Sequence, residues 1–289
     1  MNELKDSLLR VCHLSVSFES YDTHLERVDY CAITDLSVSL ERGEILAVVG
    51  SSGSGKSLLA HAVLGILPDN ARVGGEMFYR GAVMTDGMKS RLRGREIAFI
   101  PQSVAYLDPL MRVGDQVCGT AGESVRERQR AAFRHFNLKR ETADSYPFQL
   151  SGGMARRVLL STAFVADPEL LIADEPTPGL DLELAIEALK DFRVMADQGK
   201  GILLITHDID LALGVADKVA IFHEGRVVET AAAAAFSGDG AGLKHPYSRA
   251  LFRALPQNGF SLERCPACGA SEATWDVDGE TMRCRCSDA

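Results

Sequence analysis

The sequence predicts an α/β protein that has a mostly parallel sheet, an antiparallel β supplement and a helical subdomain. Short apolar runs at 45–49, 170–174 and 201–206 alternate with longer helix-forming segments, and this alternation is typical of a parallel sheet. Two earlier runs, 9–18 and 32–40, alternate apolar and polar residues, as antiparallel strands do. With 289 residues and 46% hydrophobic content, the chain can bury one large core beside a small appendage.

Composition and charge exclude several classes of function. The formal net charge of −9 and the pI near 5.3 argue against a protein that holds nucleic acid through its phosphates, because such contacts need clustered Lys and Arg. We therefore expect no nucleic-acid partner. No stretch approaches the roughly 18 uncharged apolar residues of a membrane span, and the N-terminus has no apolar region of the signal-peptide kind. These features predict a cytosolic chain.

The two antiparallel strands come first in the chain. We expect the polar segment 19–31 between them to be a hairpin loop. An aromatic side chain in this region can stack on an adenine ring, and Phe18 is the candidate, with Tyr21 and Tyr30 behind it. The alternative for each is an ordinary core or surface aromatic.

The stretch from 44 to 59 carries the strongest motif. An apolar run leads into a glycine-rich loop and then into a helix-forming run, in the spacing of a phosphate-binding loop. Glycines let successive backbone N–H groups and a helix N-terminus face the phosphates of a nucleotide. We expect the Lys56 ammonium on the β- and γ-phosphates and the Ser57 hydroxyl on Mg²⁺. The predicted loop comprises Gly50, Ser51, Ser52, Gly53, Ser54, Gly55, Lys56 and Ser57.

Two weaker signals lie in the middle of the chain. A predicted buried strand ends just before Gln102, at the edge where open α/β sheets bind ligands. Residues 103–149 are charged and helix-forming, which indicates a helical insertion. A helix then opens with a serine cap and free N–H groups, which form either a second anion site or a simple capped end, at Ser151, Gly152 and Gly153.

Paired carboxylates follow the apolar run 170–174. An acid at the end of such a strand forms the second half of a phosphate-loop nucleotide site, so we expect Asp174 to hold Mg²⁺. Glu175 can then orient and deprotonate the attacking water. The run 201–206 ends at His207, which either reaches a γ-phosphate or only caps the next helix.

Taken together, these residues resemble the ATP-binding cassette family over almost the whole chain. The resemblance implies a P-loop NTPase fold with a RecA-like core, and it implies bound ATP with Mg²⁺ held by Ser57, Gln102 and Asp174. The motifs that carry it, in the family's order, are GSSGSGKS at 50–57, Gln102, LSGGM at 150–154, LLIADEPT at 170–177, Gly179-Leu180-Asp181 and His207.

The same resemblance assigns roles to single residues. It implies that Glu175 is the catalytic base and His207 the switch at the γ-phosphate. Gln102 belongs by resemblance to the loop that joins the nucleotide site to a transmembrane partner, and Asp181 to the loop between two cassettes. The signature helix, which closes over the nucleotide of a facing cassette, corresponds to the helix that begins at Ser151, Gly152 and Gly153.

LSGGM and the downstream HPYSRALFRALP at 245–256 are similar to the ATPases of peptide and nickel uptake systems. This likeness implies a second cassette subunit, a different chain or a second copy, with two permease subunits and an extracytoplasmic substrate-binding protein. The chain is then peripheral, at the cytoplasmic face of the membrane. Peptides, nickel and metal chelates all remain open as cargo. The alternatives are a permease-free ATPase of DNA repair or the ribosome, and a non-hydrolysing regulatory cassette.

The organisation that we expect is a nucleotide-binding core at 1–102 and 160–230, a helical subdomain at 103–159 and a C-terminal extension at 231–289. The alanine run 231–235 is expected to continue into helix. Near the end of the chain, CPACG and a CxC pair can direct four thiolates at one ion, and zinc, an iron–sulfur cluster and no metal all stay open, at Cys265, Cys268, Cys284 and Cys286.

Overall fold

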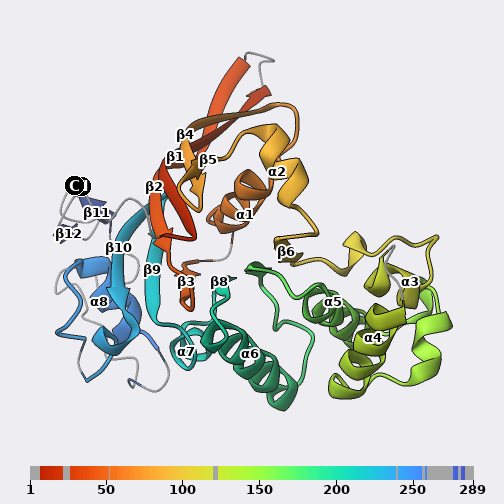
Figure 1. Ribbon diagram of the computed structural model, residues 1–289. Coiled ribbons are helices and arrows are strands. Elements are labelled where there is room, and N and C mark those ends of the chain that lie inside the picture. Colours follow the sequence, from red (N-terminus) through yellow and green to blue (C-terminus); the bar gives the residue numbers. More distant parts are fainter. Residues whose placement is uncertain are drawn as a thin grey trace.

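The parallel half of the sheet lies at the centre of the molecule. Figure 1 shows the computed structural model, and the structure describes residues 7–21, 27–51, 53–119, 123–238, 240–255, 258, 276–278 and 281–283. Five neighbouring parallel strands carry apolar runs of four to six residues, in the spatial order β9 (Lys218–His223), β3 (Ile45–Val49), β8 (Gly201–Thr206), β7 (Leu170–Asp174) and β6 (Ile97–Ile100).

Helices cover both faces of this parallel sheet. Successive residues of a strand point to opposite faces, and Leu46 and Val48 of β3 therefore pack in one cluster with α1 (Lys56–Leu64). The alternate residues Ile45, Ala47 and Val49 pack in a second cluster with α6 (Leu182–Asp197). Burial on both faces explains why the run at 45–49 is apolar throughout rather than alternating.

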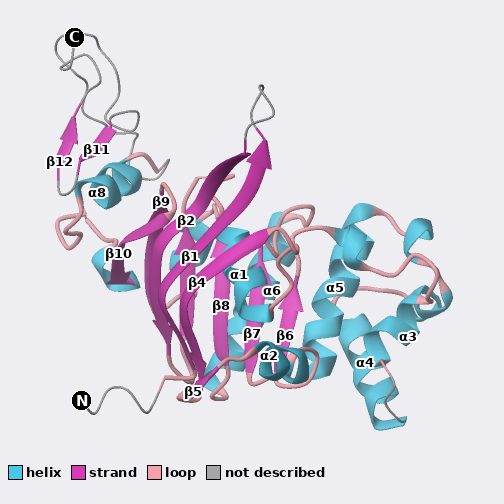
Figure 2. Ribbon diagram, turned by 90° about the horizontal axis from the view of Figure 1, so that it is seen from above, coloured by secondary structure: helices cyan, strands magenta, loops and turns pink. Residues whose placement is uncertain are grey.

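An antiparallel supplement extends the sheet. Ten of the described strands form one sheet, which confirms the predicted mostly parallel core with an antiparallel addition. Figure 2 shows β1 (Leu9–Tyr21), β2 (Arg27–Leu40) and β4 (Ala71–Tyr79) beside the parallel strands. Beyond β9 the order continues with β10 (Arg226–Ala232), β2, β1, β4 and β5 (Ala82–Val83).

The prediction of a hairpin loop at 19–31 is wrong for most of that segment. β1 runs to Tyr21 and β2 begins at Arg27, with Glu19 opposite Asp29. Arg72 on the neighbouring strand β4 forms ion pairs with both acids, the one to Asp29 at 3.5 Å. Charged pairs across strands stabilise a polar stretch of sheet, so the low hydrophobicity of this segment does not make it a loop.

The helical subdomain lies beyond β6, at the far end of the parallel sheet (Figures 1 and 2). Its helices are α3 (Val113–Cys118), α4 (Glu123–His135) and α5 (Gly152–Ala166), with 3₁₀ turns at Val104–Tyr106, Arg140–Asp144 and Pro147–Gln149. These elements bury a core of their own around Phe133, Val158 and Leu159. The helical insertion predicted at 103–149 is therefore confirmed as helix, whereas the boundaries between the proposed domains stay a prediction.

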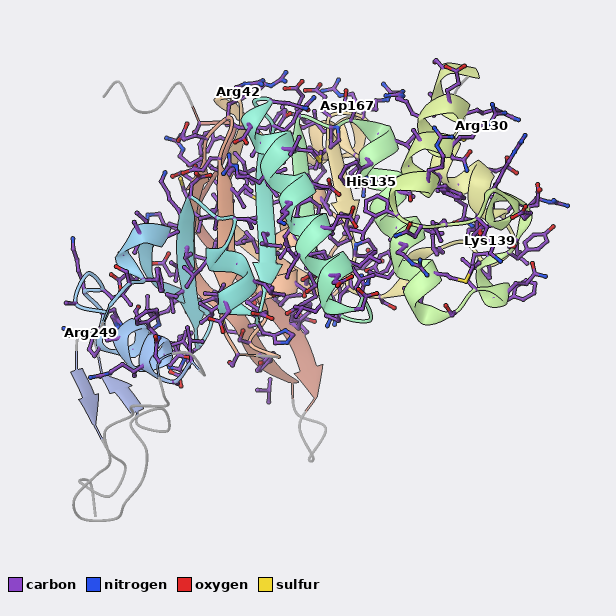
Figure 3. The ribbon with its side chains drawn as sticks, turned by 90° about the horizontal axis from the view of Figure 1, so that it is seen from below. Arg42, Arg130, His135, Lys139, Asp167 and Arg249 are labelled. Carbon is purple, nitrogen blue, oxygen red and sulfur yellow. The ribbon has the colours of Figure 1, made fainter. Side chains whose placement is uncertain are left out.

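A hydrogen bond between α4 and α6 is one of the contacts that join this subdomain to the core. His135 at the end of α4 points toward α6 (Figure 3), where its Nε2 atom lies 2.7 Å from the Asp191 carboxylate. Burial raises the pKa of Asp191, and the bond from His135 opposes that shift. The side chain of Asp191 is largely buried, so this contact holds the C-terminal end of α4 against α6 of the core.

The alanine run at 231–235 does not continue into a helix as predicted. Its first residues end β10, where Ala231 pairs with Val219 and Ala232 with Lys218, and the rest forms the single 3₁₀ turn Ala233–Ala235. Hydrogen bonds to β9 outweigh the helix propensity of alanine here.

The remaining described elements are short. They are α2 (Asp86–Leu92), α7 (Ile209–Leu213), α8 (Pro246–Arg253) and a separate hairpin of β11 (Asp276–Asp278) and β12 (Thr281–Arg283). Cys265, Cys268, Cys284 and Cys286 lie outside the described residues, and the four-sulfur site stays a prediction. Among the residues that are described, no three His, Cys, Asp or Glu side chains form a metal-binding group. No helix in that part of the chain is long and apolar enough to cross a membrane.

Candidate active site

The strand order brings the predicted motifs to one edge of the sheet. Strands β3, β8, β7 and β6 are neighbours and parallel, with Val49 opposite Thr206 and Asp174 opposite Ile205. Their carboxyl ends therefore meet at the same edge, where α/β proteins bind their ligands. The phosphate loop follows β3, His207 follows β8, the paired acids end β7, and Gln102 follows β6.

The loop that follows β3 needs its glycines. Gly53 and Gly55 have φ angles of 76° and 100°, which side-chain-bearing residues rarely adopt. A Cβ atom on Gly50 would overlap the carbonyl oxygen of Phe222 on β9. Among the described residues, no side chain caps the N-terminus of α1. Its first N–H groups and helix dipole are therefore free to face an anion.

Lys56 holds the loop together from inside. Its ammonium donates hydrogen bonds to the carbonyl oxygens of Gly50 at 2.9 Å and Ser51 at 2.7 Å. The side chain is buried, and burial lowers the pKa of Lys56, whereas the charges of Glu175 and Asp174 raise it. A cation is thus held between the loop and the two acids. Ser52, also expected in the loop, lies outside the described residues.

Asp174 has the properties of a cation ligand. The residue is 2% exposed, the neighbouring Ser57 hydroxyl lowers its pKa, and its Oδ1 atom has no hydrogen-bond partner in the described structure. Burial raises the pKa of Asp174. A buried carboxylate oxygen without a partner is costly unless a cation or donor satisfies it. The Asp174 carboxylate and the Ser57 hydroxyl are oxygen ligands of the kind that Mg²⁺ prefers, so the residues fit the predicted cation.

Glu175 is held rigidly beside Asp174. Its backbone has a φ angle of 46° and its N–H donates to the carbonyl oxygen of Ile205 at 2.8 Å. One carboxylate oxygen lies 2.8 Å from Nδ1 of His207, and the other accepts a bond from the Thr206 hydroxyl at 3.4 Å. The glutamate side chain is 8% exposed and the histidine side chain 55%. Thr206 and His207, at the end of β8, therefore orient the nearly buried carboxylate of Glu175, and His207 remains exposed to solvent.

The other predicted residues have local structural contacts or are exposed. Ser151 caps α5, its hydroxyl accepting a bond from the Met154 N–H at 3.3 Å, and Asp181 caps α6 in the same way at 2.9 Å. Phe18 is partly covered by the core. Tyr30, opposite it on β2, is 62% exposed. Gln102, in the loop after β6, and Gly152, the first residue of α5, are exposed. Gly153 beside it is half-buried.

Arg156 is a site residue that the sequence analysis missed. From α5 its guanidinium donates to the carbonyl oxygens of Pro101 at 2.7 Å, Pro178 at 3.3 Å and Gln102. It is 5% exposed, and burial lowers its pKa while Asp174 and Glu175 raise it. The residue therefore joins the signature helix to the loops after β6 and β7. A charged residue between the apolar positions 155 and 158 was the sequence signal that could have revealed it.

We expect replacement of Arg156 to slow ATP turnover without a comparable loss of folding. Arg156→Ala removes three contacts to the two loops, and Arg156→Lys offers one point charge instead of a planar fork. Misplacement of site loops by about 1 Å can cost roughly 100-fold in rate, so we expect a loss of about 10- to 100-fold for alanine and only partial rescue by lysine. The measurement is phosphate release at saturating ATP, with a melting curve for each variant. Unchanged turnover in Arg156→Ala would contradict the positioning role.

Comparisons with known proteins agree with this geometry. The family model described as "ABC transporter" matches residues 33–178. The oligopeptide transport ATP-binding protein OppD of Lactococcus lactis subsp. cremoris (strain SK11) is 36% identical over 240 residues, covering 78% of this chain and 70% of OppD. The glutathione import ATP-binding protein GsiA of Salmonella choleraesuis (strain SC-B67) is 34% identical over 281 residues, 87% of this chain and 44% of GsiA.

A solved structure described as the ATP-binding subunit of an ABC transporter has the same fold. It superposes with a TM-score of 0.66 at 28% identity, over 78% of this chain and 90% of that one. The family match spans the phosphate loop, the signature helix and both acids. The chain therefore belongs to the ABC transporter family.

Proposed function

We propose that the chain is the ATP-hydrolysing subunit of an importer that takes up peptides. The observation that carries the proposal is the meeting of Lys56, Asp174 and Glu175 at one sheet edge, with an unpartnered carboxylate oxygen on Asp174. This set supplies a phosphate-binding cation, a metal ligand and a buried base. The relatives named above are transport or import proteins by name, which favours an importer over a permease-free ATPase of DNA repair or the ribosome.

The chemistry that the residues support is hydrolysis of the γ-phosphoryl group. The loop N–H groups and Lys56 bind the phosphates, and Ser57 and Asp174 would hold Mg²⁺, which offsets negative charge on the phosphate oxygens. Glu175 takes a proton from the attacking water while the water oxygen bonds to the γ-phosphorus. The bond between the γ-phosphorus and the oxygen that bridges it to the β-phosphate breaks at the same time. His207, bonded to the Glu175 carboxylate, fixes the direction of that base. An intact base argues against the non-hydrolysing regulatory alternative.

The proposal includes a second cassette and membrane partners. One chain offers two incomplete anion sites, the Lys56 loop and the capped start of α5 at Ser151. ATP in the loop of one cassette is closed by the α5 N-terminus of the facing cassette, and hydrolysis lets the pair open. Gln102 would pass that movement to two permease subunits at the cytoplasmic face of the membrane, which receive cargo from an extracytoplasmic binding protein.

The cargo is the finer part of the proposal. The names of the relatives support oligopeptides and glutathione, whereas nickel and metal chelates have only the sequence likeness behind them. We expect a strain that lacks this chain to lose uptake of oligopeptides, dipeptides or glutathione. Labelled oligopeptide, dipeptide, glutathione and nickel are offered separately. We expect the intact gene to restore uptake and the Glu175→Gln gene not to restore it. Normal peptide and glutathione uptake with lost nickel uptake would overturn the peptide assignment, and normal uptake of all four would overturn the importer assignment.

A further inference from the structure

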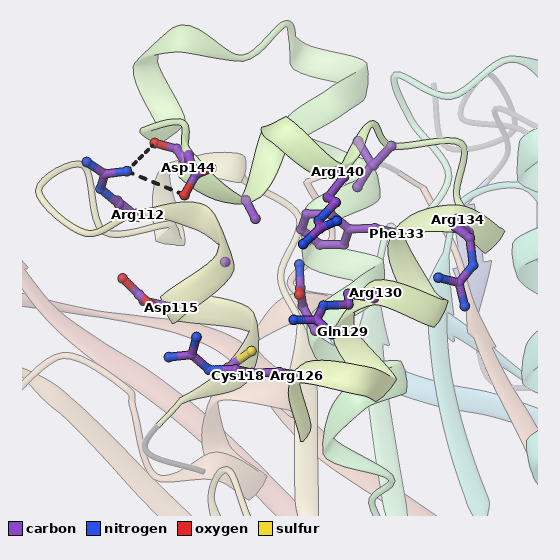
Figure 4. Close-up of a pocket in the computed structure, with 13 residues that line it drawn as sticks. Arg112, Asp115, Cys118, Arg126, Gln129, Arg130, Phe133, Arg134, Arg140 and Asp144 are labelled. Carbon is purple, nitrogen blue, oxygen red and sulfur yellow. Dashed lines mark hydrogen bonds and ion pairs between the residues drawn. The ribbon is translucent and has the colours of Figure 1, made fainter. Parts of the chain in front are cut away.

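The helical subdomain contains a cavity that has no part in the ATP site. It has a volume of about 420 Å³ and lies between α3, α4 and the 3₁₀ turn Arg140–Asp144. Figure 4 shows its lining in close-up. The volume is within the range of sites that bind small molecules. The polar side chains that line it include Arg112, Asp115, Arg126, Gln129, Arg134 and Arg140.

The lining is strongly basic, although the chain as a whole is acidic. Five arginines face two aspartates there, whereas the whole chain has a formal net charge of −9. Arg112 lies 3.5 Å from the Asp144 carboxylate, which accounts for one of the acids. Within the described residues, no ion pair or hydrogen bond engages the guanidinium groups of Arg126, Arg134 or Arg140. The cavity thus has more positive charge than its own acids neutralise.

One helix supplies most of this lining. Arg126, Gln129, Arg130, Phe133 and Arg134 are three or four residues apart along α4, so they share one face of the helix. Figure 4 shows Arg126, Gln129 and Arg130 close together, with Arg134 farther along the same helix. Phe133 is 2% exposed and forms an apolar wall. A helix face built of arginines around an aromatic wall suits an organic anion.

Gln129 adds an uncharged hydrogen-bonding group to the lining of the cavity. It lines the cavity from a position where it is only 6% exposed, and its amide has no hydrogen bond in the part of the chain that is described. A ligand with an oxygen acceptor would satisfy the amide N–H groups.

We propose that this cavity is a binding site for a small organic molecule that carries two or more phosphate or carboxylate groups. Guanidinium groups bind both kinds of oxyanion through paired hydrogen bonds, and several arginines around one cavity select a ligand of multiple charge. The site joins α3 to α4 and is separate from the phosphate loop of the ATPase.

Calorimetric titration of the full chain tests the site, with the ATP site saturated by Mg-ADP throughout. The probes are tricarballylate, which has three carboxylates, 2,3-bisphosphoglycerate, which has two phosphates, and propionate as a single-charge control. We expect at least one multiply charged probe to bind one per chain, propionate not to bind, and added salt to weaken binding. Which probe binds more tightly distinguishes carboxylate from phosphate as the natural group.

Matched variants on one helix make the test specific. Arg126→Ala and Arg134→Ala are expected to weaken binding of the probe at least about tenfold, because each removes a charged hydrogen-bond donor. Arg128→Ala is the control, since Arg128 is exposed on α4 but does not line this cavity. The proposal is overturned if neither probe saturates the chain below about 5 mM, a free energy of roughly −3 kcal/mol. Equal weakening by Arg128→Ala would overturn it as well.

A cysteine in the cavity gives an independent readout. Cys118 lines the cavity, and burial raises the pKa of its thiol while Arg126 and Arg130 lower it. A bound probe should slow alkylation of Cys118 by iodoacetamide, followed by mass spectrometry of the peptides. Alkylation of Cys31, which is exposed on β2, should not change. Equal protection of both cysteines would show that the probe does not act at the cavity.

Discussion

Glu175→Gln is expected to abolish ATP turnover while leaving ATP binding intact. The substitution removes the proton-accepting carboxylate but keeps an oxygen that can accept the bonds from His207 and Thr206. Loss of a positioned general base costs about 10²- to 10⁴-fold in rate. Phosphate release measures turnover, and equilibrium titration with a fluorescent ATP analogue measures binding. We expect the first to fall by that factor and the affinity to change little.

Glu183→Gln is the matched control for this experiment. Glu183 lies exposed in the first turn of α6, so its substitution makes the same chemical change away from the site. Its turnover should equal that of the parent chain. If Glu175→Gln retained more than about a tenth of the parent turnover, a general-base role would be excluded, because that loss is below the range of such groups.

Local motifs explain why the sequence could predict which segments meet at this sheet edge. The loop at 50–57 and the acids at 174 and 175 are each encoded within a few residues, and each follows an apolar strand. Parallel strands place their carboxyl ends together whatever their order in the chain. The prediction that these segments meet therefore needed only the strands themselves, and the fold confirms that they share one edge.

Contacts between distant segments explain what the sequence did not reveal. The partners of Arg156 lie 55 and 22 residues away, at Pro101 and Pro178, and no local pattern marks a backbone carbonyl as an acceptor. Arg72 of β4 forms ion pairs with Glu19 of β1 and Asp29 of β2, which lie far from it in the sequence. The basic cavity could not be predicted from the sequence for a similar reason. The charged face of α4 reads as solvated surface until α3 and the turn at 140–144 are placed against it.

ATP-dependent pairing of cassettes is the second large effect that we expect. Glu175→Gln should trap the ATP-bound pair, because the chain binds ATP in the Lys56 loop and cannot cleave it. A ligand that binds only the paired form stabilises it in proportion to its excess over the dissociation constant, so saturating ATP can strengthen pairing by roughly 100-fold or more. Lys56→Ala in the same background should remove the effect, since it deletes a buried cation of the phosphate loop.

The most direct measurement is the mass in solution of the Glu175→Gln chain by sedimentation velocity, alone and mixed with the second cassette subunit of its transporter. With Mg-ATP, the account predicts a complex of two cassettes in at least one of these samples. That complex should be absent with Mg-ADP and absent with Lys56→Ala. Single cassettes in both samples at saturating Mg-ATP would contradict a nucleotide site shared between two chains.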